Sequence, residues 1–140
     1  MAVSKYRSKK VEIDGIIFDS KTEGEYYLLL KYLKKEGLIK DFILQPVYLL
    51  QQPFRKYGKR FLAIKYVADF LIIENDGTET VVDIKGLPTE TAKMKRKMFD
   101  YIYPEKTLKW IVKNKKYGDE YGWIDIDELA KIRKEIKKKK

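Results

Sequence analysis

Cysteine and histidine are both missing from the 140-residue sequence. Without cysteine the chain has no disulfides and no thiolate metal sites. Without histidine it lacks the usual general base and the usual transition-metal ligand. These absences exclude serine and cysteine triads, zinc sites and histidine-based nucleases. Any chemistry must come from carboxylates, lysines, arginines and tyrosines.

Long apolar runs are also missing. No stretch is long enough to span a membrane, and neither a signal-peptide pattern nor a lipidation motif is present. We therefore expect a cytoplasmic protein with no membrane partner. The length and the 44% of hydrophobic residues suit a single domain over residues 1–140 with a core of its own.

Charge narrows the choice of partner. Lysine and arginine number 31 against 21 acidic residues, which gives a formal net charge of +10 and a pI near 9.5. This balance is typical of proteins that bind nucleic acid or another polyanion. The simpler alternative is a solvated, lysine-rich surface.

Helical periodicity predicts a first helix from Ser20 to about Glu36, with Gly37 in the stop position. A second helix is predicted over about residues 91–102, and Asp125 is expected to cap a last one. The residues expected to face inward are Tyr26, Leu29, Leu30 and Leu33 on the first helix, and Met94, Met98, Tyr101 and Ile102 on the second.

Residues 11–18 alternate around Asp14-Gly15 like a short hairpin. Further strands are predicted over residues 42–51, 60–73, 79–85 and 107–113. Pro46 suits an edge strand, and residues 52–59 resemble an exposed basic loop. The sequence thus predicts an α/β sandwich around a mixed four-stranded sheet, with a basic β-arm over residues 1–18 and a C-terminal helix and lysine tail over residues 114–140.

The turn Asn75-Asp76-Gly77 decides whether two aspartates meet. If the three residues form the loop, with Gly77 at positive φ, then Asp69 pairs with Asp83 on one face. Because side chains alternate between the two faces of a strand, Lys85 lies on the same face as Asp83. A two-residue turn would shift the register by one and separate the aspartates. Two like charges placed opposite each other destabilise a sheet unless something positive lies between them.

Glu23 has two interpretations. In D-S-K-T-E, Ser20 caps the first helix and Glu23 can reach back to close a capping box. By helical phase Glu23 also lies at the edge of the buried face, whereas Glu25 points to the opposite side. The two roles are compatible if Ser20 caps the helix while the Glu23 carboxylate turns toward the sheet.

Together, Glu23, Asp69 and Asp83 form an all-oxygen set suited to a hard cation such as Mg²⁺ or Mn²⁺. Lys85 would stand beside a scissile phosphate and offset its developing negative charge. This set can support metal-assisted hydrolysis of a phosphodiester without histidine. Taken singly, each residue has an ordinary role, as a cap, a same-face ion pair or a strand end.

These residues resemble the PD-(D/E)xK nucleases with the restriction-endonuclease-like core. The strings F-D-S-K-T-E, A-I-K-Y-V-A-D-F, V-V-D-I-K-G and K-M-K-R-K-M-F look closest to a family of small phage and prophage proteins. The resemblance implies an αβββαβ core over about residues 19–113. It also implies catalytic roles for Glu23, Asp69, Asp83 and Lys85, with the carbonyl of Ile84 as a further metal ligand.

The chain departs from the motif at its proline, which is Ala68 here. The superfamily often adds a lysine from the second helix, and the candidates are Lys93, Lys95 and Lys97. Lys95 lies nearest the apolar face of that helix.

The leading hypothesis is a Mg²⁺-dependent DNA endonuclease of a phage or prophage, present in the cytoplasm of a bacterial host. The phosphate-binding residues would be Lys5, Arg7, Lys9, Lys10, Arg55, Lys56, Lys59, Arg60, Lys93 and Arg96. The small size suggests branched or junction DNA as substrate, cut symmetrically by a homodimer. The alternatives are a nuclease-like module that binds nucleic acid or phage proteins without cutting, and a structural role with the acids paired to lysines.

Overall fold

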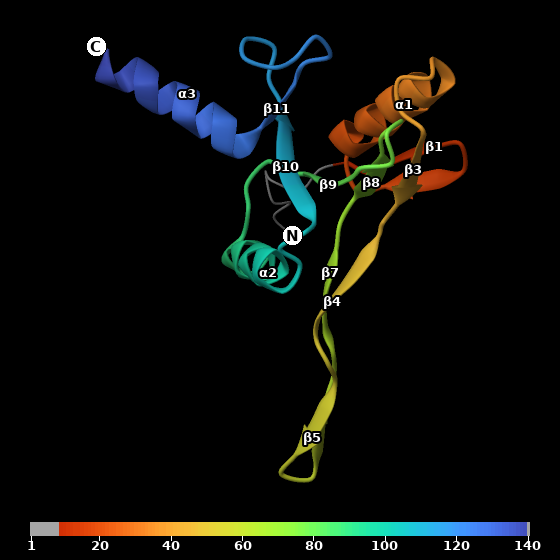
Figure 1. Cartoon of the computed structure of the whole chain (residues 1–140), viewed down its shortest axis with the longest axis vertical. Coiled ribbons are helices and arrows are strands. Elements are labelled where there is room, and N and C mark those ends of the chain that lie inside the picture. The colour runs from red at the N-terminus through yellow and green to blue at the C-terminus, as the bar shows by residue number, and fades with distance from the viewer. Residues whose placement is uncertain (1–8, 140) are drawn as a thin grey trace.

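A mixed sheet of five strands forms the centre of the computed structural model, which describes residues 9–139 (Figure 1). The strands lie in the order β11-β10-β9-β8-β3. Their bounds are β3 (Asp41–Leu44), β8 (Phe70–Ile73), β9 (Glu79–Ile84), β10 (Thr107–Lys113) and β11 (Trp123–Asp125). Three helices accompany the sheet, namely α1 (Lys21–Lys35), α2 (Glu90–Ile102) and α3 (Ile126–Lys138). The protein is therefore mixed α/β.

Only one neighbouring pair in this sheet is parallel. β9 and β10 run parallel, with α2 as the crossover between them, and the remaining pairs are antiparallel. The strand predicted over residues 42–51, for which Pro46 indicated an edge position, begins as β3 at the edge of the sheet. The sequence predicted four strands and missed β11, because three residues are too few to show a period.

The first helix begins and ends as its sequence predicts. The Ser20 hydroxyl accepts from the amide of Glu23 at 3.1 Å, and Gly37 lies at φ +73° just beyond the last turn. Tyr26 and Leu30 are buried against the sheet, where the ring of Tyr26 packs on those of Phe70 and Trp123. This burial fixes α1 on one face of the sheet.

The second helix also forms where it is predicted, but its inward face is different. Phe99 is fully buried, whereas Met94, Tyr101 and Ile102 are 54%, 87% and 38% exposed. Met98 alone of the four predicted residues packs against the core. The helix rotates so that the Phe99 ring can pack among aromatic rings from the sheet side, an arrangement that periodicity cannot reveal.

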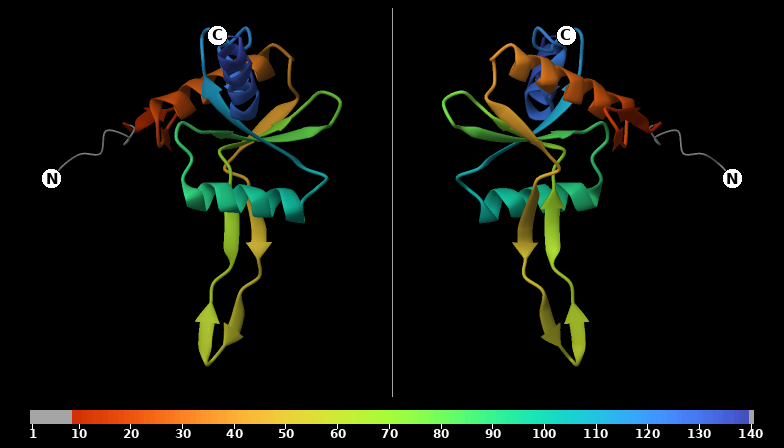
Figure 2. Two further views of the ribbon diagram at one scale, coloured as in Figure 1. Left: turned by 90° about the vertical axis from the view of Figure 1, so that its left-hand side faces the viewer. Right: turned by 90° about the vertical axis from the view of Figure 1, so that its right-hand side faces the viewer.

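Residues 47–67 form a two-stranded ribbon, called the arm below, which projects from the body (Figures 1 and 2). It consists of β4 (Val47–Gln51), β5 (Phe54–Lys56), β6 (Lys59–Phe61) and β7 (Ile64–Val67). The two long strands predicted over residues 42–51 and 60–73 are therefore wrong as continuous strands, since both bend where they leave the sheet. Gln45 marks the bend at φ +49°.

The basic loop predicted over residues 52–59 is also wrong. This segment continues the ribbon, and it reverses at Tyr57-Gly58, where both residues have positive φ. Two consecutive positive φ values define the type I′ turn that suits a two-residue hairpin. The residues are exposed and basic as predicted, but they are ordered strands.

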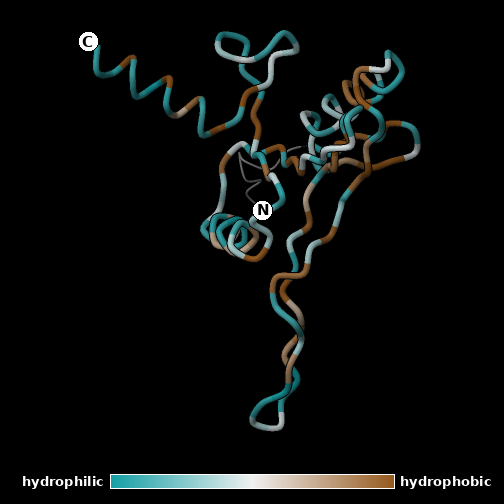
Figure 3. Tube along the Cα trace, viewed as in Figure 1, coloured by the Kyte–Doolittle hydropathy of each residue, from teal (hydrophilic) through white to brown (hydrophobic). Residues whose placement is uncertain are grey.

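The predicted N-terminal hairpin is confirmed as β1 (Val11–Ile13) and β2 (Ile16–Phe18). It packs on α1 so closely that a Cβ atom on Gly24 would lie 2.8 Å from Ile13 Cδ1. Figure 3 shows apolar residues along the central strands and hydrophilic ones at the tip of the arm. The core thus has two parts, one between the sheet and α1 and the other between the sheet and α2.

Candidate active site

The turn between β8 and β9 is the three-residue loop that the sequence predicts. The amide of Glu74 donates to the carbonyl of Thr78 at 2.8 Å, and Gly77 has φ +90°. The ladder pairs Phe70 with Val82, so Asp69 stands opposite Asp83 one step further on. The predicted register is confirmed.

Each aspartate carboxylate accepts a backbone hydrogen bond from the neighbouring strand. The amide of Asp69 donates to Asp83 Oδ1 at 2.8 Å, and the amide of Ile84 donates to Asp69 Oδ2 at 2.8 Å. Asp83 is 2% exposed, and Asp69 is half-buried. Two carboxylates are therefore fixed side by side where the arm leaves the sheet.

Ala68, where the resemblance implies a proline, uses its backbone amide in a hydrogen bond. Its amide donates to the carbonyl of Pro46 at 3.1 Å and joins the base of the arm to the bend. A proline at this position would have no N–H to donate.

A tyrosine and a tryptophan that the sequence analysis missed complete the surroundings of Asp83. The Tyr66 hydroxyl donates to Asp83 Oδ2 and accepts from Trp110 Nε1 at 2.8 Å. All three side chains are buried. Each of these aromatic side chains carries a polar atom and lies in an apolar strand. This feature could have indicated them, since buried tyrosines and tryptophans usually need a hydrogen-bond partner.

Replacing Tyr66 by phenylalanine should lower the free energy of unfolding by about 2–4 kcal/mol, because Asp83 and Trp110 would each lose a buried partner. Chemical denaturation of the variant measures this loss. Tyr101→Phe removes the same atom from a side chain that is 87% exposed and should leave the stability unchanged. Equal stability of both variants would contradict a structural role for the Tyr66 hydroxyl.

Glu23 approaches the aspartates from the first turn of α1. Its carboxylate lines a cavity of about 120 Å³ together with Asp69 and Gln45. On another side it lines a hollow shared with Ile84 and Lys85. Burial raises the pKa of Glu23, and the nearby charges of Asp19 and Asp83 raise it further. A hydrogen bond from the Asp19 backbone lowers this pKa in opposition, and the charge of Lys85 also lowers it. The Glu23 amide thus donates to the Ser20 cap, while its carboxylate reaches back to Asp19 and also interacts with the charge of Asp83.

Asp69 carries the most strongly shifted carboxyl of this group. Burial first, and then the charge of Asp83, raise its pKa to about 7, against the opposing hydrogen bond from the Ile84 amide. The charge of Glu23 raises the pKa of Asp69 further, by a smaller amount. The three acids therefore produce an excess of negative charge, which a bound cation would relieve.

The carboxylate oxygens of Asp69 and Asp83 are the kind of ligand that a hard cation binds. Mg²⁺ is commonly bound by one or two carboxylates and keeps several waters. Within residues 9–139 no three acidic side chains group closely enough to hold an ion directly. The aspartate pair would therefore supply the direct ligands of such a cation.

Lys85 lies beside this pair. Its ammonium group stands 5.5 Å from the centre of the Trp110 ring, and its charge acts on both Glu23 and Asp69. On α2, Lys95 is half-buried, whereas Lys93 and Lys97 are exposed, so Lys95 is the least exposed of the three candidates.

Arg96 has a structural role that the sequence did not suggest. Its guanidinium packs on the Trp110 ring at 4.6 Å and pairs with Asp127 of α3 at 2.6 Å. It therefore links α2 to α3.

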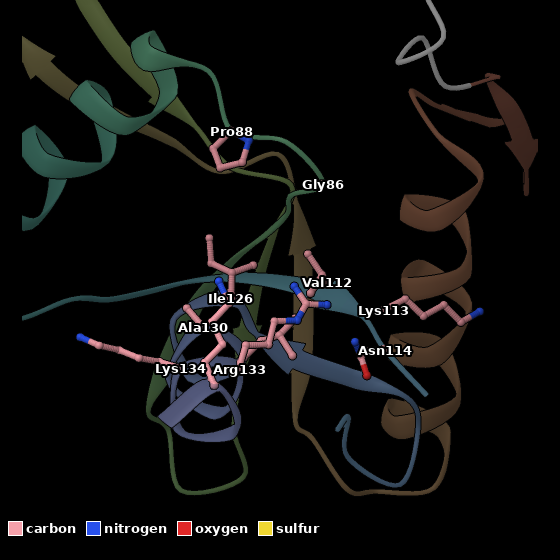
Figure 4. A pocket seen from close by; sticks show the side chains of 11 residues that line it. Gly86, Pro88, Val112, Lys113, Asn114, Ile126, Ala130, Arg133 and Lys134 are labelled. Carbon is pink, nitrogen blue, oxygen red and sulfur yellow. The ribbon is translucent and has the colours of Figure 1, made fainter. Parts of the chain in front are cut away.

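The other predicted phosphate-binding residues spread over several surfaces. Lys9 and Lys10 are exposed, and so are Arg55, Lys56, Lys59 and Arg60 on the arm. Lys5 and Arg7 lie outside the described residues. A basic groove adjoins the hollow beside Lys85, and Figure 4 shows it between α3 and the end of β10. Its cationic lining consists of Lys113, Arg133, Lys134 and Lys137.

The fold and the site define a mixed α/β protein with an aspartate pair at the root of a basic arm. The model of the family described as protein of unknown function (DUF1064) matches residues 3–119. The chain belongs to this family. No curated protein matches the chain. Among residues 9–139, no helix is both long and apolar enough to cross a membrane.

Proposed function

We propose that this protein is a metal-dependent DNA endonuclease of the PD-(D/E)xK type. The observation that carries the proposal is the pairing of Asp69 with Asp83 across β8 and β9, with Lys85 two residues after Asp83. The raised pKa of Asp69 supports it, because catalytic sites often concentrate like charges in this way. The order of α1, β3, β8, β9, α2 and β10 agrees with the core that the resemblance implies.

In this proposal Asp69, Asp83 and the carbonyl of Ile84 hold Mg²⁺ or Mn²⁺. When bound, the cation would activate a water and offset charge on the scissile phosphate. Lys85 binds a non-bridging phosphate oxygen and stabilises the charge that develops there. Tyr66 keeps the Asp83 carboxylate in one orientation, and Glu23 would hold a water beside the cation.

The test uses plasmid, linear, single-stranded and four-way-junction DNA, each incubated with the protein in Mg²⁺ or Mn²⁺. The wild type should cut at least one form, and Asp83→Asn should cut none. Asp100→Asn makes the same change on the exposed side of α2 and should cut like the wild type. No cleavage by the wild type, or equal cleavage by both Asn variants, would refute the proposal.

The same set of DNA substrates also tests whether the protein prefers branched DNA and acts as a homodimer. Preferential cutting of the four-way junction, at symmetric positions, would support a junction-resolving homodimer, whose mass sedimentation measures independently. Metal titration by calorimetry should give binding to the wild type that Asp83→Asn loses.

The second candidate is a module that binds nucleic acid or assembles with phage proteins without cutting. The exposed cations of the arm favour it, because they contribute to binding and lie away from the acids. It predicts DNA binding by the wild type that does not depend on Asp83, with no cleavage of any DNA form.

A further inference from the structure

The arm has a fixed base and an exposed tip. At its base, Tyr48 and Tyr66 pack against Phe99 of α2, and the Tyr103 hydroxyl donates to the carbonyl of Leu49 at 2.6 Å. At its tip, Tyr57 is 80% exposed. The body of the protein therefore sets the direction of the arm.

The arm carries positive charge without compensation. Residues 42–68 contain no acidic residue. Across the ribbon Arg55 faces Arg60, and Lys56 faces Lys59, so like charges stand opposite each other in two successive pairs. Such pairs destabilise a ribbon unless an anion lies against them. This arrangement points to a polyanion as the partner of the arm.

The arm also starts at the candidate active site. β7 ends at Val67, two residues before Asp69, and the ribbon from there to Gly58 spans about 30 Å at roughly 3.3 Å per residue. On B-form DNA, 30 Å corresponds to about nine base pairs, since each adds about 3.4 Å. The tip of the arm can therefore reach no further than about nine base pairs along a duplex seated at Asp69 and Asp83.

We propose that the arm lies in the major groove of a B-form DNA duplex that flanks the cleavage site, an inference that rests on the proposed function for the position of that site. A major groove about 12 Å wide admits a two-stranded ribbon in undistorted B-form DNA, whereas a minor groove of about 6 Å must first be widened to take one. The deep, narrow major groove of duplex RNA excludes the ribbon as well. The substrate class is thus DNA with a duplex on one side of the cut, of which the arm contacts up to about nine base pairs.

Binding is measured first, without added metal, so that no cleavage is needed. Replacing Arg55, Lys56, Lys59 and Arg60 by alanine should weaken binding of a 20-base-pair duplex on the order of 100-fold, and lower the slope of log affinity against log salt by roughly 3 to 4. The control replaces four exposed lysines elsewhere, namely Lys35, Lys40, Lys115 and Lys116. Equal losses in the two variants would overturn the proposal.

Folding of the arm variant is tested separately. Thermal unfolding should be unchanged or occur at a slightly higher temperature, because two repulsive pairs are removed. The wild type should also bind duplex DNA more tightly as its length rises to about ten base pairs, and should bind duplex RNA of equal length more weakly. Equal affinity for both duplexes would contradict a major-groove position.

The position of the tip is mapped directly. Because the chain has no cysteine, Tyr57→Cys provides a unique attachment point for an iron chelate that cleaves nearby DNA. Cuts on both strands that are staggered as a probe in the major groove produces, and that lie within about nine base pairs of the enzymatic cut, support the proposal. Minor-groove offsets or no cuts overturn it. If the chelate cuts the DNA but the enzyme does not, the proposed nuclease activity is refuted, whereas the position of the arm in the major groove is supported.

Discussion

Lys85→Ala is expected to lower the rate of DNA cleavage by on the order of 10³-fold while leaving DNA binding and metal binding close to those of the wild type. The reason is the position of the ammonium group, beside the aspartate pair but engaged with the Trp110 ring at 5.5 Å. Removing one preorganised charge that stabilises a transition state costs about 10²–10³-fold or more. The aspartate ligands would remain.

Single-turnover cleavage of the best DNA form, with binding measured in parallel, checks this expectation. Lys109→Ala is the matched control, because Lys109 is an exposed lysine on the neighbouring strand β10. If Lys85→Ala cuts at the rate of the control, Lys85 has no catalytic role. If it fails to bind DNA, its role is in binding.

Asp69→Asn should make the metal-free protein more stable at neutral and alkaline pH while abolishing cleavage. The pKa of Asp69 is raised from its ordinary 3.8 to about 7, so the folded state holds this proton more tightly than the unfolded state. Its contribution to stability is therefore present below pH 4 and is lost as the pH rises to 7. An uncharged asparagine avoids this loss and keeps an oxygen for the Ile84 amide. The gain above pH 7 should be roughly 2–4 kcal/mol.

Urea unfolding at pH 5 and pH 8, with a chelator present, measures the difference. At pH 8 the free energy of unfolding should be larger for the variant than for the wild type. At pH 5 this difference should be smaller. Added Mg²⁺ should stabilise the wild type and leave the variant unaffected. A variant less stable than the wild type at pH 8 would show that the Asp69 charge is compensated within the protein. Asp100→Asn, on the exposed surface, should not change stability.

The prediction for Asp69 reflects a conflict between the stability of the protein and its proposed function. Asp69 and Asp83 are held together by hydrogen bonds from the amides of Asp69 and Ile84 to their carboxylates, at 2.8 Å each, although their charges repel. Proteins retain such unfavourable groupings chiefly at functional sites. The aspartate pair therefore costs stability that a bound cation would restore.

Local chemistry along the sequence determined the frame of this site. Asn75-Asp76-Gly77 has the residues of a three-residue hairpin loop, and this loop fixed the register that brings Asp69 opposite Asp83. Ser20 likewise determined where α1 begins, which left Glu23 in its first turn. Both features depend on residues close together in the chain, so their effects are predictable from sequence.

Only the tertiary structure decided the surroundings. Tyr66 and Trp110 lie far apart in the sequence, yet they share one hydrogen bond beside Asp83. The inward face of α2 followed the packing of Phe99, and the apolar pattern of the helix did not set it. The arm extends beyond the sheet because its base packs on α2 and its strands pair only with each other. Contacts between distant segments decide each of these features, and no local pattern encodes them.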